Sequence, residues 1–311
     1  MIIWKNRPVL VTGATGFIGR KLLERLLAED ADVTTLGRTP QTSEQMSKTR
    51  VRVATATEDI ASVIAETRPD VVFHLASHAI SQHSPADIDR LVDANVRLPT
   101  QLCDAMARAG CRAIVSMGSA WQHAQGLPYA PICLYAATKQ AMQDVFQYYY
   151  AAHTISSIVL KLFHTYGPGE VRPRLVSQLC EAATTGRVLK MSEGRQVINL
   201  THIDDVVEGL LVAGSSLLEG AAGAASYSIG GDISLTIRDL VSLVEKTANA
   251  PLRIEWGALP YKPMEFFEPI AMGSRLPSWS PRTSLERGLR GLLNSQGMCR
   301  PDTESVGDFE I

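Results

Sequence analysis

A tyrosine and a lysine four residues apart, Tyr135 and Lys139, have the residue types and the spacing for proton transfer. They stand at the start of a long amphipathic stretch, residues 134–151, that we expect to form a helix. Side chains at this spacing share one helix face, so the phenol and the ammonium can point at one bound molecule. The cation would lower the pKa of the phenol from its ordinary value of ~10, which suits acid/base catalysis on a hydroxyl group. The same spacing occurs by chance in many helices, so this interpretation depends on the rest of the chain.

A glycine-rich turn between a predicted strand and a predicted helix indicates a dinucleotide site near the N-terminus. Strand-like residues 8–12 precede the pattern G-x-x-G-x-x-G, and a helical stretch follows it as far as residue 28. Glycines let the backbone approach a pyrophosphate, whose charge the helix N-terminus then holds. A plain tight turn is the alternative. The residues of this turn that we expect to bind the cofactor are Gly13, Thr15, Gly16, Phe17, Ile18 and Gly19.

The end of the second predicted strand, residues 32–36, bears on the choice of dinucleotide. NAD-specific enzymes carry a carboxylate here, which accepts a hydrogen bond from the ribose 2′-hydroxyl. This chain has Gly37 followed by Arg38, and a guanidinium pairs well with a 2′-phosphate. The sequence therefore favours NADP, used as NADPH. NAD is the alternative if Arg38 is only a solvated loop residue.

Strands alternate with helices throughout the first half of the chain. Residues 69–77 read as a buried strand that runs into a turn of small residues, 88–109 read as a helix, and 112–117 read as the next strand. This alternation predicts an α/β fold with a Rossmann-type doubly wound parallel sheet, followed by a smaller C-terminal substrate lobe. The predicted parts are a dinucleotide domain at 1–166, to which segments near 195–230 return, a lobe mainly at 167–293 and a polar tail at 294–311.

Small and hydroxyl-bearing residues end these predicted strands, where open parallel sheets bind their ligands. Leu75 and Ala76 would let the dinucleotide lie against one strand end. Ser119 follows another strand, and its hydroxyl can polarise a reacting carbonyl together with Tyr135. Ser116, close to the same strand end, is the alternative.

Composition narrows the class of function. The 311 residues suffice for one large α/β domain, or for a core domain with a smaller lobe. A formal net charge of -2 gives no reason to expect nucleic acid or an anionic membrane as a partner. No apolar stretch approaches the ~20 residues of a membrane span, and the N-terminus enters a strand rather than a signal peptide, so we expect a cytoplasmic protein. The five cysteines form no C-x-x-C pair, and His74, His78 and His83 lack further ligands at suitable spacing. We therefore expect no disulfide framework and no metal site.

The order of the motifs carries a resemblance to a known family. The matching features are the glycine turn, His74-Leu75-Ala76, Asn95, Ser119, Tyr135-x-x-x-Lys139, and the later segments 160–169, 202–207 and 227–231. Over about residues 7–292 the chain resembles an extended short-chain dehydrogenase/reductase of the NAD-dependent epimerase/dehydratase family. The resemblance implies a nucleoside-diphosphate sugar bound between the dinucleotide domain and the lobe. It also implies a homodimer formed through the helices at 89–109 and 134–151.

The resemblance assigns roles to single residues as well. Tyr135 would be the general acid, Lys139 would lower its pKa and hold the nicotinamide ribose, and Ser119 would polarise the carbonyl. Phe163 lies in the segment that closes over the nicotinamide and would bind the cofactor. The residues that we expect to reach the substrate are Ser77, His123, His164, Arg174 and Gln196. For the two histidines, a ring satisfied by hydrogen bonds within the fold is the alternative.

Departures from the family pattern bear on the reaction. Dehydratases of the family carry an Asp-Glu pair where this chain has Ala120-Trp121, so a dehydratase would lack its acid and base. Epimerases usually have an acid at the position of Gly37 and an arginine where this chain has Ile198. The stretches that look most like nucleotide-sugar 4-ketoreductases, of the CDP-abequose and CDP-paratose synthase type, are 121–123, 134–141 and 196–200.

We therefore predict an NAD(P)-dependent oxidoreductase. Its reaction would be the NADPH-dependent reduction of the 4-keto group of a nucleoside-diphosphate 4-keto-6-deoxyhexose. Two alternatives remain open: a nucleotide-sugar 4-epimerase with tightly bound NAD, and a catalytically silent NAD(P)-binding regulator. The complete set of Ser119, Tyr135 and Lys139 argues against the regulator.

Overall fold

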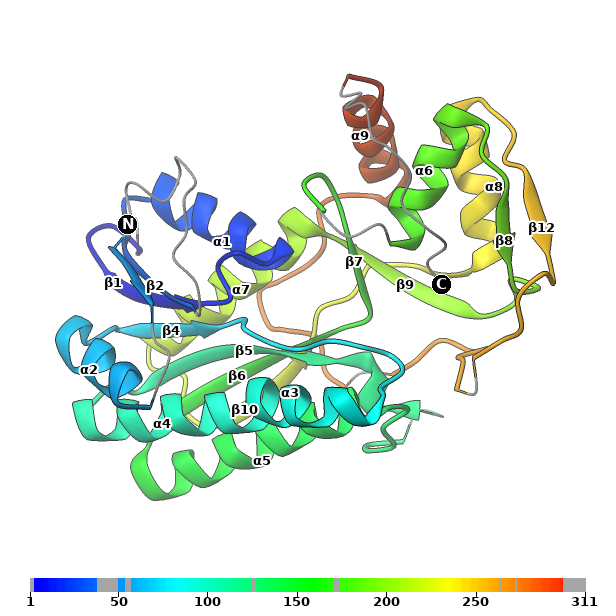
Figure 1. The fold of residues 1–311 in the computed structure, drawn as a ribbon. Helices are drawn as coiled ribbons and strands as arrows, with labels where there is room; N and C mark the ends of the chain where they lie inside the picture. The colour runs from blue at the N-terminus through cyan, green and yellow to red at the C-terminus, as the bar shows by residue number, and fades with distance from the viewer. Residues whose placement is uncertain are drawn as a thin grey trace. The chain divides into compact units, whose positions relative to one another are not determined.

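A computed structural model describes residues 3–37, 50–53, 57–124, 127–170, 174–262, 264–271 and 273–298, and the chain forms two compact units (Figure 1). The first unit consists of Met1–Leu162, Val206–Ile229 and Ala271–Ser280. The second consists of Phe163–Asp205, Gly230–Ile270 and Pro281–Ile311. Each unit therefore collects segments that are distant in the sequence, and each encloses apolar side chains of its own.

A seven-stranded parallel sheet forms the centre of the first unit. The strands lie in the order β10-β6-β5-β4-β1-β2-β3, and every neighbouring pair is parallel. Their bounds are β1 Pro8–Thr12, β2 Asp32–Gly37, β3 Arg50–Val53, β4 Val71–His74, β5 Ala113–Ser119, β6 Ser156–Leu162 and β10 Ala224–Ser228. The chain reverses its direction of winding between β1 and β4, and sheets of this kind bind ligands at the carboxyl ends of the strands at that point. The predicted doubly wound α/β fold is confirmed.

Helices cover both faces of this sheet (Figure 1). The helices α1 and α7 pack on one face around Trp4, and α2, α4 and α5 pack on the other. Their bounds are α1 Phe17–Ala28, α2 Thr57–Thr67, α3 Ile88–Val92, α4 Leu98–Ala109, α5 Leu134–His153 and α7 Ile203–Leu218. Because both faces are covered, the central strands are buried along their length rather than alternately, and every residue of β5 is buried.

The stretch 88–109, predicted as one helix, is interrupted by a π-helical turn at Asp93–Arg97, between α3 and α4. Pro99 lies in the first turn of α4 and has no N–H to donate to the carbonyl four residues earlier, which belongs to Asn95. The proline therefore accounts for the break in regular α-helical bonding. Turns of this kind often accompany functional sites.

The second unit contains two small sheets, one in the order β11-β9-β7 and one that pairs β12 with β8. Its further elements have the bounds β7 His164–Tyr166, β8 Leu189–Met191, β9 Val197–His202, β11 Ser234–Thr236, β12 Ile254–Trp256, α6 Leu175–Thr185, α8 Ile237–Ala248 and α9 Leu285–Met298. Leu289 and Leu292 of α9 enter the core of this unit. The same helix continues through residues 294–298, which we predicted as the start of a polar tail. Over the residues that the structure describes, no helix combines the length and the apolar character needed to cross a membrane.

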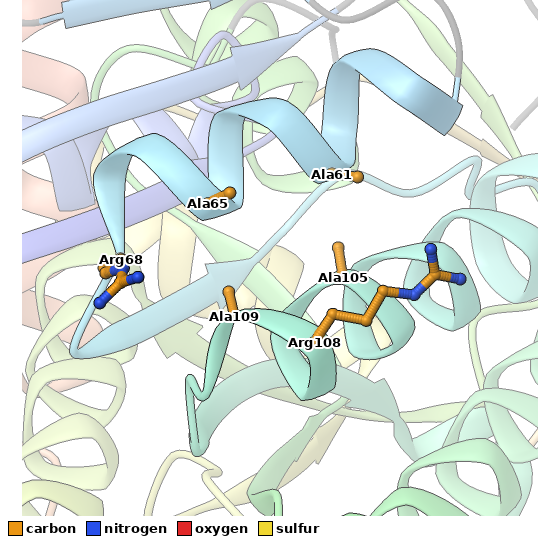
Figure 2. A pocket seen from close by; sticks show the side chains of 6 residues that line it. All are labelled: Ala61, Ala65, Arg68, Ala105, Arg108 and Ala109. Atoms are coloured by element: carbon orange, nitrogen blue, oxygen red, sulfur yellow. The ribbon is translucent and has the colours of Figure 1, made fainter.

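A surface groove of about 250 Å³ lies between α2 and α4 of the first unit (Figure 2). Its lining consists of Ala61, Ala65, Arg68, Ala105, Arg108 and Ala109. The groove exists because alanines on the two facing helices leave the space between them unfilled. None of the residues predicted to bind cofactor or substrate lines this groove.

Candidate functional site

The glycine turn has the geometry of a phosphate-binding loop. Gly13 adopts a φ of +72°, and a Cβ at this position would lie 2.5 Å from the backbone nitrogen of Ala76, so glycine is required. The Gly16 N–H donates to Gly13 O at 3.0 Å, and α1 begins at the next residue. Since Gly16 has no side chain to cap the helix, the N–H groups of the first turn are suited to an anionic ligand. These residues fit the pyrophosphate of a dinucleotide, and the Leu75-Ala76 backbone packs directly against the turn.

The other predicted cofactor residues of the turn differ in exposure. Thr15 is exposed, Phe17 and Ile18 are half-buried in the first turn of α1, and Gly19 is buried. A Cβ on Gly19 would collide with the Gly13 carbonyl, so this glycine allows the helix to pack closely on the turn. Arg38, the predicted reader of the 2′-phosphate, lies outside the described residues.

Tyr135 and Lys139 lie in the first turns of α5. The Lys139 Nζ is 5.9 Å from the centroid of the Tyr135 ring. Lys139 is 2% exposed, whereas Tyr135 is half-buried. Burial lowers the pKa of Lys139 to about 8, which leaves the side chain mostly charged at neutral pH. A buried ammonium beside a phenol can stabilise negative charge on the phenol oxygen and so assist proton transfer.

Ser119 is the last residue of β5, and the backbone then enters a short turn, Ala120–Gln122. The Ser119 Oγ accepts a hydrogen bond from the Trp121 N–H at 3.2 Å. The Trp121 ring packs edge-on against Tyr135, with ring centroids 6.1 Å apart. Trp121 therefore connects the turn that carries Ser119 to the helix that carries Tyr135.

Ser116, the alternative to Ser119, is fully buried. Its hydroxyl donates to the backbone carbonyl of His74 at 2.8 Å and lies 3.4 Å from the Met142 sulfur. These contacts join β5 to β4 and to α5. A hydroxyl used in this way is poorly placed to bind a ligand, so the arrangement favours Ser119.

The Asn95 side chain, completely buried, connects the loop after β4 to α5. Its Oδ1 accepts from the Ser77 hydroxyl at 2.8 Å and from the His78 N–H at 3.0 Å. Its Nδ2 donates to His78 O and to Thr138 Oγ1, both at 3.0 Å. The Thr138 hydroxyl in turn donates to the Tyr135 carbonyl at 2.8 Å. The network fixes the first turn of α5, and it uses the hydroxyl of Ser77, which we predicted to meet the substrate, within the fold.

His123 follows the Ser119 turn and is buried. Its Nδ1 lies 3.3 Å from Leu127 O, so this side of the ring has a partner within the fold. The opposite nitrogen, Nε2, is buried and has no hydrogen-bond partner among the described residues. Burial, and then the positive charge of Lys161, lower the pKa of His123, so the ring is neutral at neutral pH. Lys161, on β6, is itself buried, and the side chain lies against Gly118. Sequence reasoning did not single it out, because a lysine within a strand usually points into solvent.

The remaining predicted residues belong to the second unit. The Phe163 ring packs edge-on against His164, with centroids 4.6 Å apart. Burial, and then the charges of Arg174 and Lys262, lower the pKa of His164 to about 4. A neutral imidazole and two cations are therefore gathered in this unit, and of these Lys262 was not predicted as a site residue.

Two further polar groups of the second unit are the carboxylate of Glu170 and the amide of Gln196. Arg174 Nε lies 2.9 Å from Glu170 Oε1, and burial raises the pKa of that carboxyl to about 7 although the arginine opposes the shift. The Gln196 amide donates to Ser192 Oγ at 3.0 Å. Among the residues with described positions, no group of three or more His, Cys, Asp or Glu side chains is arranged to hold a metal ion.

Known proteins share this architecture and these motifs. The model of the NAD-dependent epimerase/dehydratase family matches residues 9–230. CDP-abequose synthase of Salmonella typhimurium is 24% identical over 297 residues, covering 92% of this chain and 97% of the relative. UDP-glucose 4-epimerase of Mycolicibacterium smegmatis is 27% identical over 317 residues, covering 90% and 95%. A variant of the Bacillus cereus UDP-glucuronic acid 4-epimerase, solved in complex with NAD and UDP-4-deoxy-4-fluoro-glucuronic acid, superposes with a TM-score of 0.78 at 23% identity and covers 93% and 99%.

The family match extends over more than half of the chain and includes the glycine turn, Ser119 and the Tyr135/Lys139 pair. It also reaches into segments of the second unit. The chain therefore belongs to the NAD-dependent epimerase/dehydratase family, within the extended short-chain dehydrogenases/reductases.

Proposed function

We propose that this protein catalyses the NADPH-dependent reduction of the 4-keto group of a nucleoside-diphosphate 4-keto-6-deoxyhexose. The observation that carries the proposal is the grouping of Ser119, Tyr135 and the buried Lys139 in one unit, with Trp121 in contact with Tyr135 and bonded to Ser119. These are the groups that carbonyl reduction needs: a hydrogen-bond donor for the oxygen, a proton donor, and a cation that tunes the proton donor.

Each of the residues in this group has its own role in the proposed reduction. The glycine turn from Gly13 to Gly19 binds the pyrophosphate of NADPH, which when bound supplies a hydride to C4 of the sugar. Tyr135 donates its phenolic proton to the C4 oxygen, so that hydride and proton together convert the carbonyl to a secondary alcohol. Ser119 donates a hydrogen bond to the same oxygen as negative charge develops on it. Lys139 stabilises the tyrosinate that remains.

The residues after Ser119 favour reduction over dehydration. Ala120 is fully buried, and the Trp121 ring packs against Tyr135, so this turn offers neither a general acid nor a general base for eliminating water. Similarity over nearly the whole chain to CDP-abequose synthase and to UDP-glucose 4-epimerase supports a nucleotide sugar as the substrate.

The end of β2 supports NADP as the cofactor. The strand ends at Gly37, where an NAD-specific site would place a carboxylate for the ribose hydroxyl. We propose that Arg38, the next residue, pairs with the 2′-phosphate. NAD remains the alternative, and the solved Bacillus cereus relative binds it.

The polar cluster of the second unit supports an anionic, hydroxyl-rich substrate. Arg174 and Lys262 supply positive charge for phosphate oxygens, and the neutral ring of His164 can exchange hydrogen bonds with a sugar hydroxyl. We therefore assign substrate binding to this cluster.

The second candidate is a 4-epimerase that retains NAD, favoured by the 27% identity to UDP-glucose 4-epimerase. The same serine, tyrosine and lysine would then serve both oxidation and reduction at C4. An epimerase would keep its cofactor through purification and would consume no NADPH. A silent dinucleotide-binding regulator would convert no substrate at all.

The test begins with the purified protein, whose bound cofactor is identified after denaturation. Freshly prepared CDP- and dTDP-4-keto-6-deoxyglucose are then offered with NADPH or NADH, and the loss of reduced cofactor is followed by absorbance. Preferential oxidation of NADPH supports the reductase. Retained NAD with no oxidation of either cofactor would favour the epimerase, and it would defeat the proposal.

A further inference from the structure

His74 lies at the carboxyl end of β4, beside the glycine turn, and is 1% exposed. Its Nδ1 is 2.8 Å from the hydroxyl oxygen of Thr12, the last residue of β1. The same hydroxyl accepts a hydrogen bond from the Ala76 N–H at 3.2 Å. The opposite ring nitrogen, Nε2, is buried and has no hydrogen-bond partner among the described residues. A buried polar atom in this condition is costly unless something else satisfies it.

The helix α5 brings Lys139 to this end of β4. Ser116, whose hydroxyl bonds the His74 carbonyl, also contacts Met142, and Met142 stands three residues after Lys139 on the same helix face. The charge of Lys139 acts on the His74 ring and, after burial, is the second cause that lowers its pKa to about 3. The His74 ring is therefore neutral at neutral pH.

A neutral imidazole carries a hydrogen on one nitrogen and a lone pair on the other. Two arrangements satisfy the contact with Thr12. Either Nδ1–H donates to the Thr12 hydroxyl and Nε2 presents its lone pair, or Thr12 donates and Nε2 carries the hydrogen. Next to the Lys139 ammonium, which has only hydrogens to offer, the lone pair is the favourable choice.

We propose that His74 is a positioning residue for Lys139. Its Nε2 accepts a hydrogen bond from the ammonium through one bridging water, and Thr12 holds the ring in the required tautomer. The bridge is a water rather than a direct contact in this proposal, because His74 Nε2 has no hydrogen-bond partner among the described residues. The effect is to keep a buried lysine charged and directed at Tyr135.

Two titratable side chains interact with this lysine. Tyr135 lies on the same helix with its ring 5.9 Å from Nζ, and His74 lies on β4. Burial is the cause of the lowered Lys139 pKa, and no carboxylate of the described residues contributes to it. Loss of the His74 acceptor should therefore lower the pKa of Lys139 further, because the ammonium would lose a partner that its neutral form does not need.

The first test needs no activity. In cofactor-free protein labelled with ¹⁵N-histidine, nitrogen chemical shifts report which ring nitrogen carries hydrogen, and the His74 signals are assigned by their loss in His74→Gln. We expect a neutral ring with hydrogen on Nδ1 from pH 5 to 9. Hydrogen on Nε2, or a charged ring at pH 6, would overturn the proposal. The wild-type result stands even if that variant does not fold, because replacing each other histidine in turn also yields the assignment.

The second test rests on the proposed function and uses two variants that separate the ring nitrogens. A glutamine amide reaches roughly the place of Nε2, whereas an asparagine amide reaches that of Nδ1. For His74→Asn we expect the basic limb of the kcat–pH profile to move down by ~1 pH unit, with His74→Gln closer to wild type. Equal profiles, or the opposite order, would show that His74 acts through Thr12 alone. If wild-type protein converts no substrate, the proposed function fails, and the nitrogen shifts still decide the role of His74.

Discussion

The Asn95 amide donates a 3.0 Å hydrogen bond to the hydroxyl of Thr138, and this bond joins the π-helical turn before α4 to the helix that carries Tyr135 and Lys139. Asn95 also accepts a hydrogen bond from the His78 N–H and donates one to the His78 carbonyl. This one buried side chain therefore sets the distance between the loop after β4 and the first turn of α5.

Asn95→Ala should lower the free energy of unfolding by on the order of 3 kcal/mol, since it leaves buried donors and acceptors of His78 and Thr138 unpaired. Thr138→Val removes only one partner of Asn95 and should cost less than half as much. Chemical denaturation of the three proteins measures this order. Equal losses in the two variants would mean that the His78 bonds contribute little.

The two serines of β5 form a matched pair. Ser119→Ala should reduce kcat by on the order of a hundredfold, because it removes a donor to the developing oxyanion. Ser116→Ala should leave kcat within a few-fold and instead lower stability by about 1 kcal/mol, because it breaks the bond to the His74 carbonyl. Steady-state kinetics and thermal unfolding on both variants test the assignment. A larger loss of kcat in the Ser116 variant would reverse it.

Burial of Lys139 should make the protein less stable at neutral pH than a variant without the charge. The folded pKa, about 8, lies below the ordinary value of 10.5, so between these values the unfolded chain binds the proton and the folded chain does not. The loss of unfolding free energy caused by the buried charge is therefore full below pH 8 and disappears as the pH rises toward 10.5. Lys139→Met should be inactive, yet more stable than wild type by on the order of 2 kcal/mol at pH 7.

The stability gain of Lys139→Met should shrink steadily above pH 8. Lys5→Met, at an exposed lysine of the same unit, is the control and should change stability little at any pH. Unfolding curves at pH 7 and pH 9.5 suffice. A destabilised Lys139→Met protein at pH 7 would show that the ammonium is better solvated than its burial implies.

Local patterns predicted much of this structure. The strand Pro8–Thr12, the turn from Gly13 and the helix from Leu134 follow from apolar runs, glycine spacing and amphipathic period, all of which act over a few residues. Tyr135 and Lys139 were recognisable because their chemistry depends on a spacing within one helix. The same reasoning found Ser119 as a polar residue at a strand end.

Contacts between distant segments were beyond the sequence. Thr12 and His74 are 62 residues apart, and only the parallel pairing of β1 with β4 brings their side chains together. The sequence does not distinguish the π-helical turn from plain helix, since Pro99 is also compatible with a helix start. The burial of Lys161 likewise depends on β5 and β10 flanking its strand.

Tyr135→Phe should reduce kcat by at least a hundredfold while leaving the dissociation constant of NADPH nearly unchanged, because the phenol donates the proton but the cofactor is held mainly by the glycine turn. Tyr148→Phe, on the exposed side of the same helix, is the control and should behave as wild type. Turnover and fluorescence titration with NADPH separate the two effects. Retained turnover in the Tyr135 variant would remove it from the reaction.

In the proposed reaction the protein delivers hydride from NADPH to C4 of the sugar. The most direct measurement supplies NADPH carrying two deuterium atoms at nicotinamide C4, together with a nucleoside-diphosphate 4-keto-6-deoxyhexose, and locates the transferred deuterium by mass spectrometry and NMR. If NADPH is the hydride donor, the product carries one deuterium on C4 and one equivalent of NADP⁺ forms. A product without deuterium, formed with no consumption of NADPH, would contradict the proposed reduction and would favour an epimerase with its own bound NAD.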